Sequence, residues 1–319
     1  MRAWYLTPGT PRLGLELREA AFPEPGPHQL LVRLHAAGLN RGELSPGGAA
    51  AKPGGTEGAG EVVKLGAGVA QFKPGDRVMA RCPGSFAEYA LMDARETLPV
   101  PAALSWEEAA AVPIAFLVVY DMVLAQGRLK AGEWLLVAGV TSGVGVYALQ
   151  AAKALGAKVI GTSGSAEKLE KLKPLGLDVA LATRKPDFAP AVMKATGERG
   201  ADLAIDAVGG SVFAECVRAL GFEGRLAFVG YVDGALRAEM DLEALHSKRL
   251  TLFGVSNKLR NAEQRALTVR GFAERMLPLL ADGRIRPLID RVYPFDELPA
   301  AKERMEANAH VGKLVVTIN

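Results

Sequence analysis

The chain has 319 residues, of which 49% are hydrophobic and 23% are charged, and its net charge at pH 7 is +3. This length is sufficient for two domains, because single hydrophobic cores usually stop growing below it. The small net charge gives no basic stripe of the kind that nucleic-acid-binding proteins carry. The most apolar run, residues 109–120, is too short to cross a bilayer. We therefore expect neither a nucleic-acid partner nor a membrane span.

Two features point to the cytoplasm. Residues 1–6 alternate as a strand does and lack the long apolar stretch of a signal peptide. The two cysteines, Cys82 and Cys216, lie too far apart in sequence to form a disulfide framework. Reduced thiols in a cytoplasmic protein are the simplest interpretation.

Up to about residue 100, short apolar runs are separated by turns rich in proline and glycine. The predicted strands are residues 30–39, 60–65, 77–80 and 86–92. Turns are expected at 53–55 and 74–75, because proline presets φ and glycine accepts positive φ. This pattern predicts a compact antiparallel β domain.

After Trp106, strands alternate with helices. The predicted strands are residues 133–138, 158–162, 201–207, 225–230 and 250–255. The predicted helices are residues 144–155, 166–173 and 211–220. Such alternation predicts right-handed βαβ units, a parallel sheet and a doubly wound nucleotide-binding fold.

The last part of the chain changes character again. We expect a long helix over residues 262–282, a turn at Tyr293 and Pro294, and a helix over residues 298–308. Residues 313–318 form a predicted final strand with no helical partner, so we expect it to join the sheet of the N-terminal domain.

A glycine-rich turn follows the first strand of the doubly wound region. Residues 135–150 read LLVAGVTSGVGVYALQ, which is a strand, a turn and a helix. Backbone N–H groups in such a turn can approach a pyrophosphate, which the helix N-terminus attracts. The spacing GxxxGxG differs from the common GxGxxG, and a tight turn without a ligand is the alternative interpretation.

The end of the second strand indicates which dinucleotide is bound. NAD-specific sites place an acid there for the ribose 2′-hydroxyl, but residues 159–166 contain none. Hydroxyls and cations suited to a 2′-phosphate are present instead: Ser163, Ser165, Lys168 and Arg184. This predicts NADPH, although Lys168 alone is also typical of a solvated helix surface.

Several motifs in the same order resemble one known family. They are residues 36–40 (AAGLN), 55–62 (GTEGAGEV), 73–78 (KPGDRV), 84–89 (GSFAEY), 109–113 (AAAVP), 139–145, 206–210 (DAVGG), 224–226 (GRL) and 312–315 (GKLV). The chain resembles the medium-chain dehydrogenase/reductase superfamily, in particular its zinc-free zeta-crystallin and quinone oxidoreductase branch, over nearly its whole length.

The resemblance implies an α/β fold with two domains and a nucleotide in the cleft between them. A GroES-like β-barrel catalytic domain is expected over residues 1–112, rejoined by 262–319, and a Rossmann dinucleotide-binding domain, a doubly wound parallel sheet, over 113–261. The implied pyrophosphate site comprises Ser142, Gly143, Val144 and Gly145. The implied 2′-phosphate contacts are Ser163 and Lys168, and the nicotinamide half is lined by Phe228, Val229, Gly230, Val255 and Ser256.

The resemblance also implies roles for Lys313 and Asn40. Lys313 is expected to reach the cofactor from the returning strand, and Asn40 is expected near the nicotinamide ribose and the substrate. Zinc-dependent relatives carry cysteine and histidine at the positions of Asn40 and Thr56, and Cys82 is the only cysteine in the region where their structural-zinc loop needs four. We therefore expect no metal.

Three departures limit what the resemblance says about the substrate. The segment 41–53 lacks the tyrosine usual in the family's pocket. Val118 replaces a threonine in the helix after Pro113, and Thr183 replaces a tyrosine on the adenine side, which leaves Arg184 as the expected contact.

The expected activity is therefore NADPH-dependent hydride transfer to a small molecule, a quinone or a conjugated enone, with Asn40 and then Arg41 as candidates to donate a hydrogen bond to the acceptor oxygen. Two alternatives stay open: an alkenal or enoyl double-bond reductase of the same branch, and a non-catalytic NADPH-binding structural or regulatory protein. We also expect a homodimer, because residues 250–255 would form an apolar strand at the sheet edge.

Overall fold

The structure is a computed structural model that describes residues 1–9, 13–44 and 50–318. The chain divides into two compact units, Met1–Leu117 together with Asn261–Asn319, and Val118–Arg260. The sequence led us to expect divisions at 112/113 and 261/262. Part of the segment 41–53, which lacks the family's tyrosine, lies outside the described residues.

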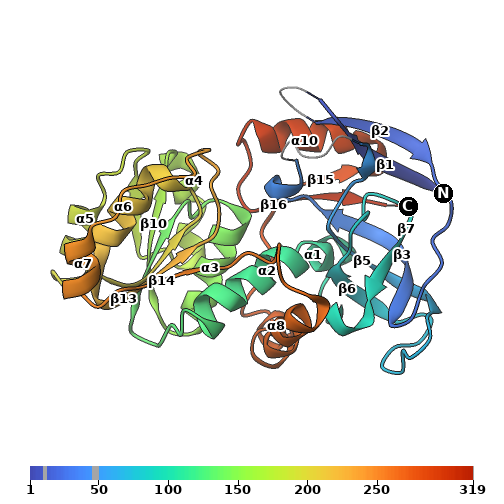
Figure 1. The fold of residues 1–319 in the computed structure, drawn as a ribbon, viewed down its shortest axis with the longest axis horizontal. Helices are drawn as coiled ribbons and strands as arrows, with labels where there is room; N and C mark the ends of the chain where they lie inside the picture. The colour runs from blue at the N-terminus through green and yellow to red at the C-terminus, as the bar shows by residue number, and fades with distance from the viewer. Residues whose placement is uncertain (10–12, 45–49, 319) are drawn as a thin grey trace. The chain divides into compact units, whose positions relative to one another are not determined.

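The first unit is built on two sheets (Figure 1). The larger has the order β15-β16-β3-β5-β6-β8, with β7 also paired to β3. Its strands are β3 (Gln29–Gly38), β5 (Glu57–Leu65), β6 (Arg77–Arg81), β7 (Tyr89–Asp93), β8 (Thr97–Pro99), β15 (Ile289–Pro294) and β16 (Lys313–Thr317). The smaller sheet comprises β1 (Arg2–Thr7), β2 (Gly14–Glu19) and β4 (Lys52–Pro53). All pairs are antiparallel except β15 with β16, so the predicted antiparallel domain is confirmed.

The last strand brings three polar residues to one end of this sheet. β16 pairs antiparallel with β3, with Val315 opposite Gly38, which confirms that the final strand returns to the N-terminal sheet. β5 also runs antiparallel to β3. The end of β3 and the starts of β5 and β16 therefore meet at the same edge, which brings together Asn40, Glu57 and Lys313.

Short helices complete the first unit. They are η1 (Arg41–Leu44), η2 (Ala94–Glu96), α1 (Trp106–Ala110), α2 (Pro113–Val119), α8 (Ala262–Arg275), α9 (Leu277–Ala281), η5 (Phe295–Glu297) and α10 (Leu298–Glu306). The single helix predicted over 262–282 is wrong, because the chain breaks at Met276 and restarts with Pro278 in the first turn of α9, where its missing N–H costs nothing.

The predicted turn at Tyr293 and Pro294 is also wrong, because both residues belong to β15. Proline is tolerated there because β15 is the outermost strand of its sheet and Pro294 is its last residue.

The second unit is a parallel sheet of six strands in the order β11-β10-β9-β12-β13-β14. The strands are β9 (Trp134–Ala138), β10 (Lys158–Ser163), β11 (Val179–Ala182), β12 (Ala201–Asp206), β13 (Leu220–Phe228) and β14 (Thr251–Gly254). The predicted doubly wound fold is confirmed. The strand order reverses between β9 and β12, and ligands of such folds bind at the carboxyl ends of the strands at this point.

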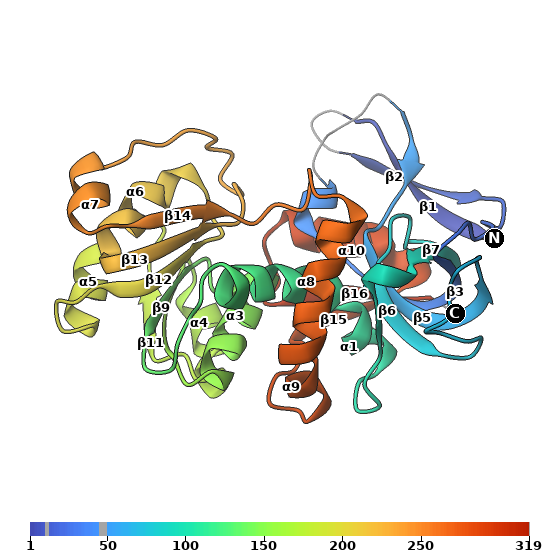
Figure 2. The ribbon, with the colours of Figure 1, turned by 60° about the horizontal axis from the view of Figure 1, so that its bottom comes forward.

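Helices cover both faces of this sheet, with α3 and α4 on one side and α5, α6 and α7 on the other (Figure 2). They are η3 (Tyr120–Ala125), α3 (Gly143–Ala154), α4 (Ala166–Glu170), η4 (Lys173–Leu175), α5 (Ala189–Ala195), α6 (Gly210–Ala219) and α7 (Leu242–Ser247). Among the described residues β14 pairs only with β13, so the strand predicted for the sheet edge lies there. Within the described part of the chain, no helix has the length and apolar character needed to span a membrane.

Candidate active site

The glycine-rich turn forms the N-terminus of α3. Ser142 is the N-cap residue: its Oγ accepts a hydrogen bond from Gly145 N at 3.1 Å and donates one to the carbonyl oxygen of Gly139 at 2.9 Å. The backbone N–H groups of Gly143 and Val144 stand in the first helical turn, where the helix offers them no acceptor. Because α3 follows β9 at the point of strand reversal, this helix end is a suitable anion site.

Gly145 is required by the packing of the turn itself. A Cβ at this position would lie 2.5 Å from the carbonyl oxygen of Gly139 and 2.7 Å from the Cα of Val140. From the sequence, this glycine is expected in the pyrophosphate site. The contact within the chain is sufficient to exclude a side chain there.

The hydroxyl and cationic residues expected to contact a 2′-phosphate come together at the end of β10. Ser163 Oγ lies 3.3 Å from Thr141 Oγ1 and accepts from Ser165 N at 3.3 Å. Ser165 also caps α4, since its Oγ accepts from Lys168 N at 3.3 Å. A Cβ built on Gly164 would lie 2.3 Å from Arg184 Nε, so the Arg184 side chain passes directly over this loop.

Glu167 is the acid nearest in sequence to these hydroxyl and cationic residues, and its carboxylate is already paired with a lysine. Glu167 forms an ion pair with Lys171 at 3.0 Å, and the Lys171 ammonium lowers the pKa of that carboxyl. Thr183 is likewise engaged, because its Oγ1 donates to Asp187 Oδ1 at 2.8 Å.

The residues expected around the nicotinamide lie at the carboxyl ends of neighbouring strands. Phe228 ends β13, and its carbonyl oxygen accepts from Val255 N, which follows β14, at 3.3 Å. Val229 N donates to the carbonyl oxygen of Asp206 at 3.0 Å, and Ser256 Oγ accepts from Lys258 N at 3.2 Å. Gly230 follows Val229, so these residues form one continuous edge beside β12.

Asp206, which ends β12, was part of a sequence motif but was not predicted as a site residue. It is fully buried, and its Oδ1 accepts from Val208 N and Gly209 N, both at 2.9 Å. Burial raises the pKa of its carboxyl to about 6. The side chain therefore shapes the loop after β12.

In the first unit, Lys313 is the centre of a buried polar cluster. Its ammonium donates to the Leu39 carbonyl oxygen at 2.8 Å, to Asn40 Oδ1 at 2.9 Å and to Glu57 Oε1. Lys313 is 3% exposed and Glu57 is 0% exposed. An ammonium carries three donors and no acceptor, so all of its donors have partners in this cluster.

The ammonium fixes the orientation of the Asn40 amide. Because Oδ1 must face Lys313, the Nδ2 group takes the other amide position, where it donates to Glu57 Oε1 at 2.8 Å and to Thr56 Oγ1 at 3.3 Å. The contact with Thr56 is the longer of the two. The amide hydrogen that faces Thr56 is therefore the one that could most easily be donated to a ligand instead.

Glu57 was missed in the sequence analysis, although it lies in the quoted GTEGAGEV motif. Its second oxygen, Oε2, accepts from Ile114 N at 2.6 Å and so anchors the start of α2. A carboxylate in a glycine-rich strand, together with a lysine at the start of a returning strand, was the only available signal. This signal can be recognised only once the starts of β5 and β16 are known to lie together.

Glu43 was also missed. Its Oε1 accepts from Asn40 N at 2.5 Å, while its Oε2 is buried without a hydrogen-bond partner among the described residues. Burial raises the pKa of this carboxyl to about 7, and the nearby Glu57 adds to the rise. The Asn40 N–H, the Thr56 hydroxyl and the Lys313 ammonium act in the opposite direction.

Arg41 is directed away from this cluster. Its Nη2 donates to the Met305 carbonyl oxygen at 2.5 Å and to Asn308 Oδ1 at 2.6 Å, and burial lowers its pKa. The guanidinium therefore joins η1 to the end of α10. The structure brings Asn40 together with Lys313 and does not bring Arg41 to the Asn40 amide.

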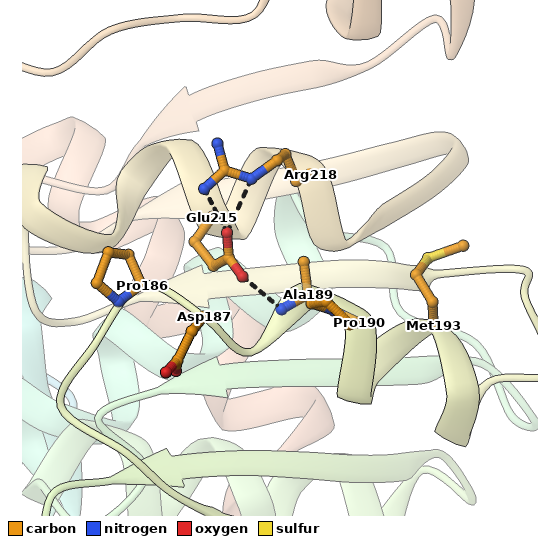
Figure 3. A pocket seen from close by; sticks show the side chains of 7 residues that line it. All are labelled: Pro186, Asp187, Ala189, Pro190, Met193, Glu215 and Arg218. Atoms are coloured by element: carbon orange, nitrogen blue, oxygen red, sulfur yellow. Dashed lines mark hydrogen bonds and ion pairs between the residues drawn. The ribbon is translucent and has the colours of Figure 1, made fainter.

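A hollow between α5 and α6 carries a further buried acid (Figure 3). Glu215 Oε1 accepts from Ala189 N at 2.6 Å, and its Oε2 accepts from Arg218 Nε at 2.8 Å. Oε1 therefore joins α6 to α5, and Oε2 is paired within α6. The buried Glu215 carboxyl in this hollow therefore has a structural role.

Two family profiles match the chain. The profile described as alcohol dehydrogenase GroES-like domain matches residues 26–102, and the one described as zinc-binding dehydrogenase matches residues 143–269.

The second description implies zinc, but the residues do not fit it. The positions that carry zinc ligands in relatives hold the Asn40 amide and the Thr56 hydroxyl, and the Lys313 ammonium is bonded to that amide. A cation there would face a fixed positive charge. No group of three or more His, Cys, Asp or Glu side chains suited to a metal occurs in the described part of the chain.

The similarity to known proteins extends over nearly the whole chain. It is 30% identical to the human synaptic vesicle membrane protein VAT-1 homolog, covering 97% of this chain and 84% of that protein. It is 28% identical to the rat quinone oxidoreductase, covering 94% and 92%. The crystal structure of Escherichia coli quinone oxidoreductase complexed with NADPH superposes with a TM-score of 0.87 at 28% identity, covering 99% of each chain. The chain therefore belongs to the medium-chain dehydrogenase/reductase superfamily and is a quinone-oxidoreductase-like oxidoreductase within it.

Proposed function

We propose that the chain is an NADPH-dependent reductase that transfers hydride to a quinone or a conjugated enone without a metal. The observation that carries the cofactor assignment is the cluster at the end of β10, where Ser163, Ser165 and Arg184 meet and the neighbouring Glu167 is already paired. The NADPH complex of the E. coli quinone oxidoreductase supports it.

We assign different residues to the three parts of the cofactor. The first turn of α3, with Ser142, Gly143, Val144 and Gly145, holds the pyrophosphate through its N–H groups. The 2′-phosphate is held by Ser163, Ser165, Lys168 and Arg184. The nicotinamide half is lined by Phe228, Val229, Gly230, Val255 and Ser256.

Lys313 acts within the first unit by orienting Asn40. All three ammonium donors are used by Leu39, Asn40 and Glu57, so we assign Lys313 a positioning role in place of the direct cofactor contact that the resemblance implied. Arg41 has a structural role: its guanidinium holds η1 against the end of α10.

When bound, NADPH supplies a hydride. The chain must then align the acceptor and stabilise the negative charge that develops on its oxygen. The Asn40 Nδ2 hydrogen that now faces Thr56 is the donor we assign to that oxygen, because its present bond is the weaker of the two. Quinones and enones suit such a site, since conjugation spreads the charge and little further help is needed.

Three further parts of the proposal follow from the chain itself. The ammonium of Lys313 takes the place where a metal would supply positive charge, so no metal is required. Both cysteines are free and buried, in keeping with a reducing cytoplasm. The outer edge of β14 is the expected contact of a homodimer.

The test is a panel of quinones, enals, conjugated ketones and enoyl thioesters, with oxidation of NADPH and of NADH followed in parallel. We expect turnover with a quinone or an enone and a preference for NADPH. Turnover with enoyl thioesters or enals alone would favour the double-bond reductase. Tight NADPH binding with no turnover on any acceptor would indicate a non-catalytic binding protein.

A further inference from the structure

The buried cluster of the first unit contains two carboxyl groups and one ammonium. Glu57 and Lys313 form a buried ion pair, and Glu43 lies beside them at the Asn40 backbone. If both carboxyls were ionised, the cluster would carry one uncompensated negative charge away from water, which is costly. The arrangement is neutral when one carboxyl holds a proton.

The hydrogen bonds indicate which carboxyl holds it. Glu57 accepts from Lys313 Nζ, from Asn40 Nδ2 and from Ile114 N, so its two oxygens face three donors. Glu43 accepts from the Asn40 N–H and interacts with the Thr56 hydroxyl, which can itself act as an acceptor, and its Oε2 has no hydrogen-bond partner among the described residues. Donors stabilise a carboxylate, so the proton belongs on Glu43.

The Thr56 hydroxyl lies between this carboxyl and the Asn40 amide. It accepts from Asn40 Nδ2, and it also interacts with the Glu43 carboxyl. A hydroxyl both donates and accepts, so it can receive a proton on one side and release one on the other.

We propose that Glu43 stores the proton required to complete the reduction and that the Thr56 hydroxyl passes it to the acceptor oxygen held by Asn40. This inference rests on the proposed function. The inference adds a proton source to the proposed function. In it, Glu43 holds the proton and acts through Thr56.

The step balances as follows. Hydride transfer breaks a C–H bond of NADPH, which would be oxidised to NADP⁺, and forms a C–H bond on the acceptor, which is reduced and keeps an electron pair on its oxygen. The Thr56 O–H breaks as that oxygen gains the proton, and Thr56 regains a proton from the Glu43 carboxyl. Glu43 is left as a carboxylate and takes a proton from water before the next turnover, since the residue is partly exposed although its Oε2 is buried. Together with the hydride, one proton is consumed in each turnover.

The surrounding charges set the pH range. Lys313 on β16 and Glu57 on β5 are the charges that act on the Glu43 carboxyl. Arg41, on the same helix η1, is directed to the end of α10, and the Lys302–Glu306 ion pair lies on α10, which packs against η1. The pKa of Glu43 is raised to about 7, so the carboxyl is protonated below that pH and loses its proton above it. The rate of the protonation step should therefore fall as the pH rises through about 7.

A direct experiment is a carbon-13 NMR titration of the protein labelled at the side-chain carboxyl carbon of glutamate. One glutamate should titrate near pH 7, and its signal should be missing in Glu43→Gln. This label leaves the aspartates silent, so Asp206 does not interfere. The titration requires neither cofactor nor substrate, and the wild-type protein alone decides it. The absence of any glutamate that titrates between about pH 6 and 8 would overturn the inference.

A kinetic experiment tests the use of the proton. Glu43→Gln should lower kcat on the preferred acceptor by about a hundredfold or more and remove the fall in rate above neutral pH. Thr56→Val should lower kcat similarly, and Thr56→Ser should restore it. Glu61→Gln, which removes an exposed carboxyl from the same strand as Glu57, should change neither property.

Retention of the wild-type rate and pH profile by Glu43→Gln would refute the proton store while leaving the proposed reductase function intact. Conversely, a wild-type protein with the titrating glutamate but no turnover would refute the function and leave the stored proton established.

Discussion

At the scale of single residues, Lys313 shows how one buried charge can organise a site. Its three donors fix a carbonyl oxygen and an amide at the end of β3 and a carboxylate at the start of β5. Because an ammonium cannot accept a hydrogen bond, it leaves the Asn40 amide only one orientation. The donor face of that amide is thus set before any substrate arrives.

Removing the ammonium should therefore affect both stability and activity. Lys313→Met leaves the Glu57 carboxylate buried without its counter-ion, and we expect a loss of about 3 to 5 kcal/mol in the free energy of unfolding. Urea unfolding measures it. Addition of Glu57→Gln to this variant should recover part of the loss, since no charge then remains buried. A double variant that is less stable than Lys313→Met would contradict this account.

The cations at the end of β10 provide a second prediction at this scale. Arg184→Ala and Lys168→Ala should each weaken NADPH binding by about tenfold and leave NADH binding nearly unchanged, because only the 2′-phosphate interacts with these groups. Fluorescence titration with both dinucleotides measures the ratio. Lys171→Ala, which removes a lysine of the same segment that is paired with Glu167, is the matched control. Equal losses for NADPH and NADH would refute the assignment.

At the scale of elements, the turn between β9 and α3 is limited by its own packing. A side chain at position 145 would collide with backbone atoms of Gly139 and Val140, which have no freedom to withdraw. Cofactor binding and local folding therefore require the same glycine.

Gly145→Ala should lower the thermal unfolding midpoint even in the absence of any dinucleotide, and it should abolish dinucleotide binding. Gly254→Ala is the control, because a Cβ at that position in β14 would meet no heavy atom of the described residues within 4 Å. Calorimetric melting of the two variants without ligand makes the comparison. An unchanged midpoint for Gly145→Ala would show that the turn tolerates a side chain.

Elements with strong periodicity could be predicted from the sequence, and those set by tertiary context could not. The buried strands β9, β10 and β12 and the returning strand β16 follow the predicted positions closely. β11 and α5 were missed, because β11 has only four residues and alternates between partly buried and exposed positions.

The candidate site shows the same division. Asn40 and Ser142 stand in recognisable motifs, whereas Glu43 and Glu57 gain their meaning only from strand ends that are distant in sequence. A lone acid in a glycine-rich stretch looks like any surface residue until the sheet register brings an ammonium beside it. The structure also gives Arg41 different partners: Met305 at the end of α10 and Asn308 just after it, which lie 264 and 267 residues away.

At the scale of the whole molecule, the chain combines two units of different architecture, a largely antiparallel unit assembled from both ends of the chain and a parallel one formed by its middle. The parallel unit ends at β14, a strand with partly buried Leu252 and Phe253 and with one unpaired edge in the described structure. Such an edge commonly pairs with a second copy.

Light scattering at micromolar concentration should therefore give the mass of a dimer. Phe253→Lys should shift the population to monomers, because a charge on the edge strand opposes pairing. Val292→Lys, on the edge strand β15 of the other unit, should leave the mass unchanged. A monomeric wild-type protein would refute the dimer.

The most direct test of the central claim is calorimetric titration of the purified protein with NADPH and, separately, with NADH. The account predicts saturable binding of one equivalent of NADPH per chain, with an affinity at least tenfold higher than for NADH, because the groups at the end of β10 are suited to the additional phosphate. Absence of heat from both dinucleotides, or equal affinity for the two, would contradict it.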